Sequence, residues 1–389
     1  MKTDKNCLWL RFFIAVTIMS LGLTLLFGCT QRESVNLSTA FETNDEEKAE
    51  TEKNEREMRT IIDMAGREVE IPIKISKVAT LGSVARMMVY AGCADRITGL
   101  SDLEIGANQG MPYAYVNKEF FSKLTPVASG GAASENYEEA LLMLQPDVIL
   151  TNSMDANAVN TMQEKFKIPV IVLDYDGIFD ESVYNALILI GDIMDTRERC
   201  DSLIAAMKLW QVDLEQRTKD IPEDKKPSVY AGAVSFKGGH GIEGTYGQFP
   251  PFNAIHANNV VDETDVSGAL ILEKEKLLIW NPDIIFLTPN NMGLVNEDYA
   301  KNPNYYQRLH AVQNNRIYAM INYNYYGTNI ELAIADAYYA GRVIYPEAFS
   351  DIDFNAKADE IFIEMLGKSY LDILNTTGNA FGEIELGVK

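Results

Sequence analysis

Apolar positions between residues 196 and 219 recur at three- and four-residue steps. Leu203, Met207, Trp210 and Leu214 fall on one side of a helical wheel, the other positions are largely charged, and no Pro or Gly interrupts the stretch. This spacing predicts a single amphipathic helix. At 1.5 Å per residue it would run roughly 35 Å, enough to cross a small domain. We therefore expect a long, rigid helix around which the rest of the chain is organised.

The same sequence unit stands on each side of this helix. Residues 139–150 read Glu-Ala-Leu-Leu-Met-Leu-Gln-Pro-Asp-Val-Ile-Leu, and residues 275–286 read Glu-Lys-Leu-Leu-Ile-Trp-Asn-Pro-Asp-Ile-Ile-Phe. Each unit predicts a helix end, a Pro-Asp turn and a buried strand. Strands alternate with helices in the rest of both halves, which is typical of βαβ units and parallel sheets. We predict an α/β fold: two Rossmann-like lobes with parallel sheets, joined by a long rigid backbone helix.

The domain boundaries follow from this alternation. We place the N-terminal lobe at 60–178, the helical backbone between the lobes at 179–226 and the C-terminal lobe at 227–374. A tail at 375–389 is expected to fray.

Three local segments carry further expectations. Residues 61–71 predict a hairpin around Gly66, and residues 270–280 predict a helix. Residues 101–137, rich in Gly, Ser, Tyr and Asn, predict a long loop. Loops of that length are uncommon in compact domains unless they carry function, so we expect this one to be functional.

The first 59 residues are predicted to export and anchor the chain. Residues 1–28 combine basic residues, a short apolar run and a final small residue, as a secretory signal peptide does. Cys29 directly after Gly28 resembles the lipobox of bacterial lipoproteins, in which that cysteine is lipidated. The polar, charge-dense remainder of 29–59 predicts a disordered tether. An uncleaved membrane anchor is the alternative, and both interpretations place the folded part outside the cytoplasm.

Composition narrows the classes of function. The formal net charge is −22 and Lys and Arg are not clustered, which argues against nucleic-acid binding. The chain has three histidines, His240, His256 and His310, so a metal site built on several histidines is excluded. Once the N-terminal cysteines are assigned to the signal peptide and the lipid, Cys93 and Cys200 remain, and two buried free thiols are favoured over a disulfide.

Candidate ligand residues lie in loops that follow strands, where open α/β sheets place their ligands. The glycine-rich loop 237–246 contains His240, which either contacts a ligand or is a loop histidine bonded to backbone. Tyrosines gather in loops of both lobes, where flat rings and phenol donors could line a cleft. The candidate ligand-binding residues are Tyr113, Tyr115, Lys237, His240, Glu243, Tyr246, Tyr323 and Tyr325.

Glu139 and Glu275 occupy the same place in the two copies of the repeat. Glutamates on helix surfaces are usually solvated. Equivalent placement on two lobes is what a two-armed contact with a symmetric partner needs, so we expect both residues to dock a partner.

The chain resembles the substrate-binding lipoproteins of ABC importers, in the class with a helical inter-lobe backbone that includes receptors for ferric siderophores, haem and cobalamin. The resemblance is carried by KVATLGSVARMMVYAGCADRITGL (77–100), NYEEALLMLQPDVIL (136–150) and YAGAVSFKGGHGIEGTYGQFPPFNAIHANNVVDE (230–263). It implies a ligand bound between the lobes under the loops 101–137, 237–249 and 322–327. It also implies that Glu139 and Glu275 dock on arginines of the permease.

From this resemblance we expect an extracytoplasmic, lipid-anchored solute-binding protein rather than an enzyme. Its cargo would be an iron complex, a ferric siderophore or haem, with no intrinsic cofactor, and its partner an ABC permease dimer with its ATPase. The shortage of histidine argues against a bare divalent metal ion as ligand. A cobalamin receptor, a chelatase-like enzyme and a membrane-tethered sensor stay open as alternatives.

Overall fold

The computed structural model describes residues 57–131, 133–153 and 155–388. The chain divides after Glu55, and all of the described residues belong to the unit Arg56–Lys389. The expectations for the signal peptide, for Cys29 and for nearly all of the tether therefore lie outside the described residues. Within those residues, every helix is too short or too polar to span a membrane.

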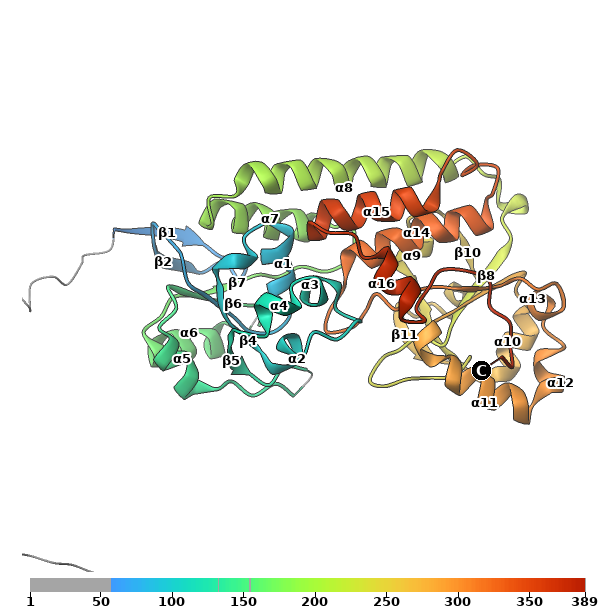
Figure 1. The fold of residues 1–389 in the computed structure, drawn as a ribbon. Coiled ribbons are helices and arrows are strands. Elements are labelled where there is room, and N and C mark those ends of the chain that lie inside the picture. The colour runs from blue at the N-terminus through green and yellow to red at the C-terminus, as the bar shows by residue number, and fades with distance from the viewer. Residues whose placement is uncertain (1–56, 132, 154, 389) are drawn as a thin grey trace, which may run out of the picture. The chain divides into compact units, whose positions relative to one another are not determined.

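Parallel strands form the centre of the N-terminal lobe. Among the described residues they make a five-stranded sheet in the order β5-β4-β3-β6-β7. Figure 1 shows this lobe on the left, in blue to green. Strands β3, β6 and β7 are completely buried and consist almost entirely of apolar residues, as expected for a sheet covered on both faces. The strands are β3 (Val78–Thr80), β4 (Ile97–Ser101), β5 (Thr125–Ala128), β6 (Val148–Thr151) and β7 (Val170–Val172). The helices are α1 (Ala85–Tyr90), α2 (Asp102–Ile105), α3 (Pro112–Tyr115), α4 (Lys118–Phe121), α5 (Glu138–Leu144) and α6 (Ala156–Phe166).

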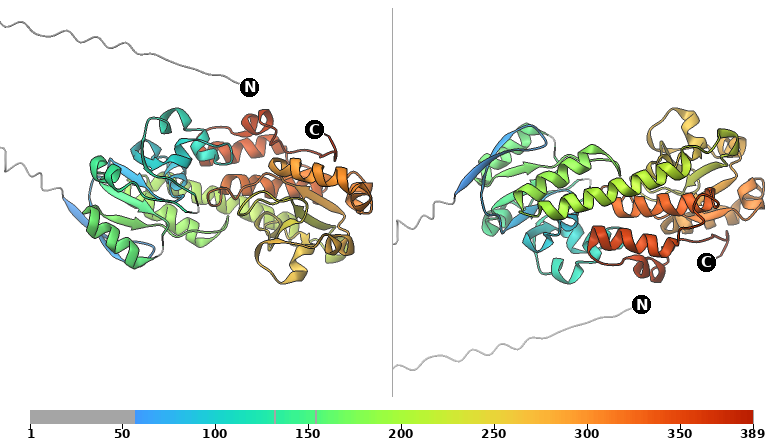
Figure 2. Two further views of the ribbon diagram at one scale, coloured as in Figure 1. Left: turned by 90° about the horizontal axis from the view of Figure 1, so that it is seen from below. Right: turned by 90° about the horizontal axis from the view of Figure 1, so that it is seen from above.

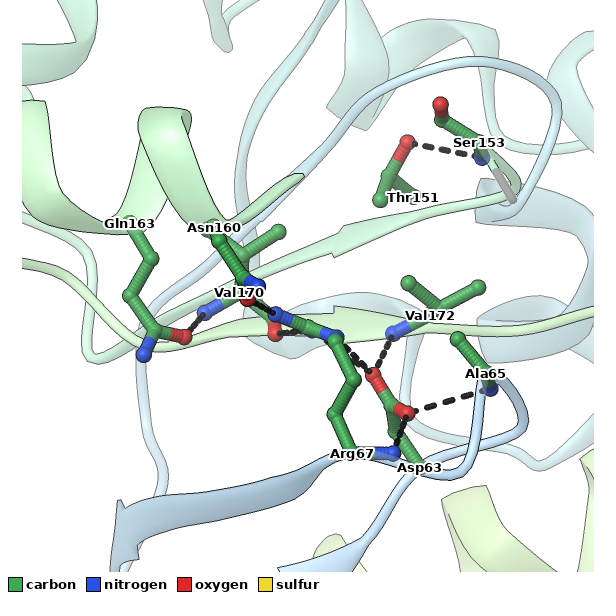
Figure 3. Close-up of polar contacts among 9 residues, drawn as sticks. All are labelled: Asp63, Ala65, Arg67, Thr151, Ser153, Asn160, Gln163, Val170 and Val172. Atoms are coloured by element: carbon green, nitrogen blue, oxygen red, sulfur yellow. Dashed lines mark hydrogen bonds and ion pairs between the residues drawn. The ribbon is translucent and has the colours of Figure 1, made fainter. Parts of the chain in front are cut away.

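The predicted hairpin is present as β1 (Met58–Ile62) and β2 (Glu68–Pro72), which pair antiparallel around Gly66. Its turn covers the edge of the parallel sheet at β7 (Figure 3). The Asp63 carboxylate accepts the backbone N–H of Val172 at 3.1 Å and pairs with Arg67 at 2.7 Å. Arg67 also donates to the carbonyl oxygen of Val170. These bonds occupy edge groups that would otherwise be free to pair with another chain.

The expected backbone helix is confirmed as α8 (Arg197–Thr218), a continuous helix of 22 residues preceded by α7 (Glu181–Ile193). Its four periodic apolar side chains are all buried. Seen from above, α8 extends across both lobes (Figure 2). The Trp210 indole N–H donates to Glu360 at 2.8 Å, which ties α8 to α15 (Phe354–Leu366) beside it.

The C-terminal lobe repeats the parallel design. Its described residues form a four-stranded parallel sheet in the order β10-β8-β12-β13, and β9 and β11 pair antiparallel beside it. The strands are β8 (Ser228–Gly232), β9 (Gly244–Gly247), β10 (Asn258–Asn259), β11 (Gly268–Ile271), β12 (Ile284–Leu287) and β13 (Ile317–Ala319). The helices are α9 (Pro250–Asn253), α10 (Lys274–Trp280), α11 (Met292–Lys301), α12 (Pro303–Tyr306), α13 (His310–Gln313), α14 (Ile330–Ile344), α15 and α16 (Leu371–Thr376).

The sequence repeat is a structural repeat down to single bonds. Helices α5 and α10 both end on a left-handed residue, Gln145 with φ 45° and ψ 60° and Asn281 with φ 45° and ψ 61°. The aspartate of each Pro-Asp turn then accepts from a serine at the start of the neighbouring strand segment. Asp147 accepts the backbone N–H of Ser76 at 2.8 Å, and Asp283 accepts that of Ser228 at 2.8 Å. The two lobes are therefore built around the same local unit.

Three local expectations are wrong. Residues 101–137 are not one long loop, because they contain α2, α3, α4 and β5; helices of four residues are too short to leave a periodic signal. Residues 268–271 pair with β9, so the predicted helix 270–280 begins only at Lys274. The tail is not frayed. Ile384 donates its backbone N–H to Ile317 at 2.8 Å, and Ala319 donates to Gly382 at 2.8 Å, so the tail lies along β13.

Helix α14 offers a test of core packing. A Cβ on Gly341 would lie 2.3 Å from the ring of Phe349, a fully buried side chain. Gly341→Ala is therefore expected to lower the free energy of unfolding by about 1–3 kcal/mol through overpacking. Gly293 in α11 has no atom near its Cβ position, so Gly293→Ala should leave stability unchanged or raise it by up to about 1 kcal/mol. Urea denaturation measures both, and equal effects would contradict the packing argument.

Candidate functional site

A buried arginine stands at the carboxyl end of β3, on the first turn of α1. Arg86 is fully buried, and it is the one charged residue between Lys77 and Asp95. Its Nη2 donates to the carbonyl oxygen of Tyr326 at 2.8 Å and lies 3.3 Å from Oδ1 of Asn329. Within the described ranges, Nε and Nη1 are buried without a hydrogen-bond partner. A guanidinium is always charged in proteins, so this is a buried cation with unused donors.

The partners of Arg86 belong to the N-terminal end of α14 and the loop before it. Asn329 precedes α14, and its side-chain amide donates to the carbonyl oxygens of Gly110 and Tyr323, both at 2.9 Å. The Tyr90 hydroxyl on α1 donates to the carboxylate of Glu331 on α14. The end of α14 is thereby held against α1, and this contact joins the two lobes.

Two buried carboxyl groups accompany the arginine. Glu104 accepts hydrogen bonds from the hydroxyls of Ser101 at 2.6 Å and Tyr113 at 2.8 Å. Burial nevertheless raises the pKa of Glu104 to about 7, against the opposing effect of these bonds and of the Arg86 charge. Burial also raises the pKa of Glu331. The cluster thus combines one permanent positive charge with two carboxyl groups that burial drives toward their neutral form, a setting that suits a bound anion.

The N-terminal tyrosines do not stand open to a cleft. Tyr113 is fully buried on α3, and the Arg86 guanidinium lies over its ring at 4.9 Å from the centroid. Tyr115 is half-buried, packs edge-on against Tyr370 at 6.0 Å and carries Lys118 above its ring. Tyr113 therefore supports the arginine from below rather than presenting a free hydroxyl.

The C-terminal tyrosines form a second group. Tyr246 and Tyr323 line a small pocket at the carboxyl ends of β8, β12 and β13. Tyr323 is 4% exposed, its ring lies tilted against that of Phe249 with 5.6 Å between the centroids, and its hydroxyl has no hydrogen-bond partner among the described residues. Tyr325 packs its ring against Gly110 of the other lobe. The loop 322–327 therefore reaches the N-terminal lobe at the place where Arg86 lies.

The glycine-rich loop forms a third group. His240 stacks on Phe236 at 4.2 Å, and its Nε2 lies 2.8 Å from the carbonyl oxygen of Phe236, which is the backbone-bonded histidine of the alternative interpretation. Glu243 accepts the N–H of Gly241 at 3.0 Å, and Lys237 is exposed. His240 and Glu243 share a surface depression with residues of α10 and α11, apart from the pocket of Tyr246 and Tyr323.

A family model described as periplasmic binding protein matches residues 79–323, more than half of the chain. The chain belongs to this family. Proteins of this family are solute-binding proteins of ABC importers, work outside the cytoplasm and deliver ligands to a permease and its ATPase. The fold class expected from the sequence, two lobes with parallel sheets and a long helix, is confirmed.

Individual relatives of this binding protein are distant in sequence. The molybdate-binding protein MolA of Haemophilus influenzae is 22% identical over 341 residues, which cover 80% of this chain and 92% of MolA. A periplasmic solute binding protein from Veillonella parvula superposes with a TM-score of 0.68 at 19% identity, covering 83% of this chain and 97% of that one. The haem-binding protein HutB of Vibrio cholerae has a TM-score of 0.53 at 16% identity, covering 69% and 99%.

The docking candidates lie on the outer surface of this binding protein. Glu139 on α5 and Glu275 on α10 are exposed, and neither side chain makes an ion pair or hydrogen bond within the described residues. Cys93 and Cys200 are buried free thiols, as expected. No group of three metal-binding side chains occurs among the described residues.

The interpretation of the sequence missed Arg86, Asn329 and Glu331. A signal for Arg86 was present, because one charge in the apolar run Val84–Ala91 is unusual for a structural helix. For Asn329 and Glu331 nothing in the local pattern distinguishes a buried polar residue at a helix start from an exposed one.

Glu104 predicts a pH dependence of stability. Its pKa rises from the ordinary 4.5 to about 7 on folding, so its contribution is fully present below about pH 4.5 and is lost as the pH rises toward 7. The difference corresponds to about 3 kcal/mol. Glu104→Gln cannot ionise, so its advantage over the parent should grow by up to that amount across this window. Urea denaturation at a series of pH values measures it, and parallel profiles for the two proteins would contradict the assignment.

Proposed function

We propose that this binding protein captures an anionic, metal-containing solute between its lobes and delivers it to an ABC permease. An iron complex, a ferric siderophore or haem, is the proposed cargo. The observation that supports an anionic ligand is Arg86, a fully buried guanidinium with two nitrogen atoms that no described residue satisfies.

The physical argument concerns the cost of burying a charge. An unpaired buried cation is destabilising by several kcal/mol, so it persists only where function requires it or a counter-charge arrives. Carboxylate and phenolate groups of an iron complex, or haem propionates, can accept paired hydrogen bonds from the free edge of a guanidinium. Cobalamin is less well matched, because its corrin side chains are uncharged amides and its one anionic group is the phosphodiester of the nucleotide loop.

A small metal oxyanion is the second candidate. MolA, which aligns over 92% of its length, is a molybdate-binding protein, and a tetrahedral oxyanion offers acceptors to a guanidinium in the same way. The loop 322–327 lies close over Arg86, since a Cβ at Gly327 would lie 2.5 Å from Nη1. This small space favours an oxyanion over a larger ligand. A bulky complex would have to displace the loop 322–327, whereas a small oxyanion needs much less room.

Delivery is proposed to use Glu139 and Glu275. Both are exposed, stand at the same position of the structural repeat and keep their carboxylates free of partners among the described residues. A permease dimer with an arginine on each half would meet one glutamate per lobe.

Substitution of Arg86 tests the ligand assignment. Arg86→Met is expected to weaken binding of the true cargo ten- to a hundredfold. This loss corresponds to the energy of a hydrogen bond to a charged group, about 1.5–3 kcal/mol. Calorimetric titrations with haem, a ferric siderophore, molybdate and cobalamin identify the cargo at the same time.

Arg96→Met is the matched control. Arg96 precedes β4, whereas Arg86 follows β3, so the two arginines lie at opposite ends of the parallel sheet. The control should bind like the parent, with thermal melts showing that both variants fold. Unchanged binding in Arg86→Met would place the ligand elsewhere.

Charge reversal tests the docking assignment. The double variant Glu139→Arg, Glu275→Arg should keep its affinity for the cargo but lose uptake into proteoliposomes that contain the permease and ATPase, because like charges then face each other. Glu198→Arg, on the exposed surface of α8, is the control and should transport normally. Normal uptake by the double variant would show that these glutamates do not dock.

A further inference from the structure

Two large apolar side chains are strongly exposed at the same position of the structural repeat. Met143 on α5 is 86% exposed, and Ile279 on α10 is 76% exposed. Aligning the two Pro-Asp turns places Met143 opposite Ile279, just as it places Glu139 opposite Glu275. Helices α5 and α10 belong to different lobes, and Figure 1 shows both of them well below α8.

The surroundings of the two side chains are the same. Each lies two residues before the left-handed cap of its helix, whose backbone angles agree within 1° at Gln145 and Asn281. Each also lies four residues after the docking glutamate, so the apolar and the acidic side chain share one helix face a single turn apart. The protein thus presents the same two-part surface twice, a carboxylate beside an apolar side chain.

Single exposed apolar residues are common on protein surfaces. Repetition at equivalent sites is different, because the helix itself needs no apolar residue there. Leu141 and Leu277 already bury the inner face of each helix, at 0% and 1% exposure. An apolar side chain on the outer face stays in contact with water and contributes no hydrophobic free energy unless a partner covers it.

We propose that Met143 and Ile279 are apolar contacts for the permease, one on each lobe, beside Glu139 and Glu275. The proposal rests on the docking function argued above. The partner is a surface that presents, twice and related by a two-fold axis, an apolar socket next to a cationic group. The glutamates steer and orient the encounter, and the apolar side chains lengthen its lifetime by removing apolar area from water.

The test uses Met143→Ser, Ile279→Ser and the double variant, with Leu209→Ser as control. Leu209 is 70% exposed on α8, outside the repeat. Binding of each full-length mature chain to the permease–ATPase complex in nanodiscs is measured by interferometry at low and high salt, with thermal melts as the folding control.

Each repeat variant is expected to bind the complex about tenfold more weakly, and the double variant more weakly still, as loss of one buried apolar side chain implies. The loss should be equal at both salt concentrations. The loss caused by Glu139→Arg and Glu275→Arg should shrink at high salt, because salt screens charges. Leu209→Ser should bind like the parent.

Three outcomes would overturn the proposal. If the glutamate variants are impaired while Met143→Ser and Ile279→Ser bind like Leu209→Ser, the apolar contacts are wrong and the docking glutamates stand. If neither set is impaired, the docking face itself is wrong. If the chain alone forms a dimer in sedimentation experiments that the serine variants abolish, the exposed pair belongs to a second copy and not to the permease.

Discussion

The rest of the structure depends on a buried polar joint between α1 and the N-terminal end of α14. Arg86 and Tyr90 on α1 meet Glu331, the side chain of Asn329 and the carbonyl oxygen of Tyr326 from the other lobe. The four side chains, those of Arg86, Tyr90, Asn329 and Glu331, are fully buried. Their hydrogen bonds must therefore be satisfied within the protein or by a ligand. The joint therefore does two things at once. It connects the lobes, and it leaves unused guanidinium donors at the proposed ligand site.

The long helices give this joint a stiff frame. Helix α8 extends across both lobes, and α15 packs against α14 and α1, so these two helices connect the halves in addition to the joint (Figure 1). Both outer copies of the repeat, on α5 and α10, belong to lobes that this frame connects. In the proposed function, the inner surface would bind an anion while the outer surface would present Glu139 and Glu275 to the permease.

Several candidate site residues could be named from the sequence, but their surroundings could not. Tyr246 and Tyr323 do share a pocket past the strand ends, as the general rule for α/β sheets indicates. Tyr113 was expected beside the ligand as an accessible phenol, yet it is buried beneath Arg86, and its hydroxyl donates to Glu104 on α2. His240 bonds to its own loop, since a histidine four residues after Phe236 can reach that carbonyl without help from the other lobe. A loop tyrosine or histidine looks the same in sequence whether it faces solvent, ligand or core.

The sequence by itself determined the features of the fold that depend on residues close together along the chain. The periodicity of α8, the alternation of strands with helices, the hairpin around Gly66 and both copies of the Pro-Asp unit belong to this class, because their signals are local patterns of polarity and turn chemistry. The tertiary structure decided the burial of Arg86 and its bond to Asn329, which lies 243 residues away. It also decided that the tail lies along β13. Such contacts are set by which faces of distant elements pack together, and the free energy of burying a charge depends on that packing rather than on any local pattern.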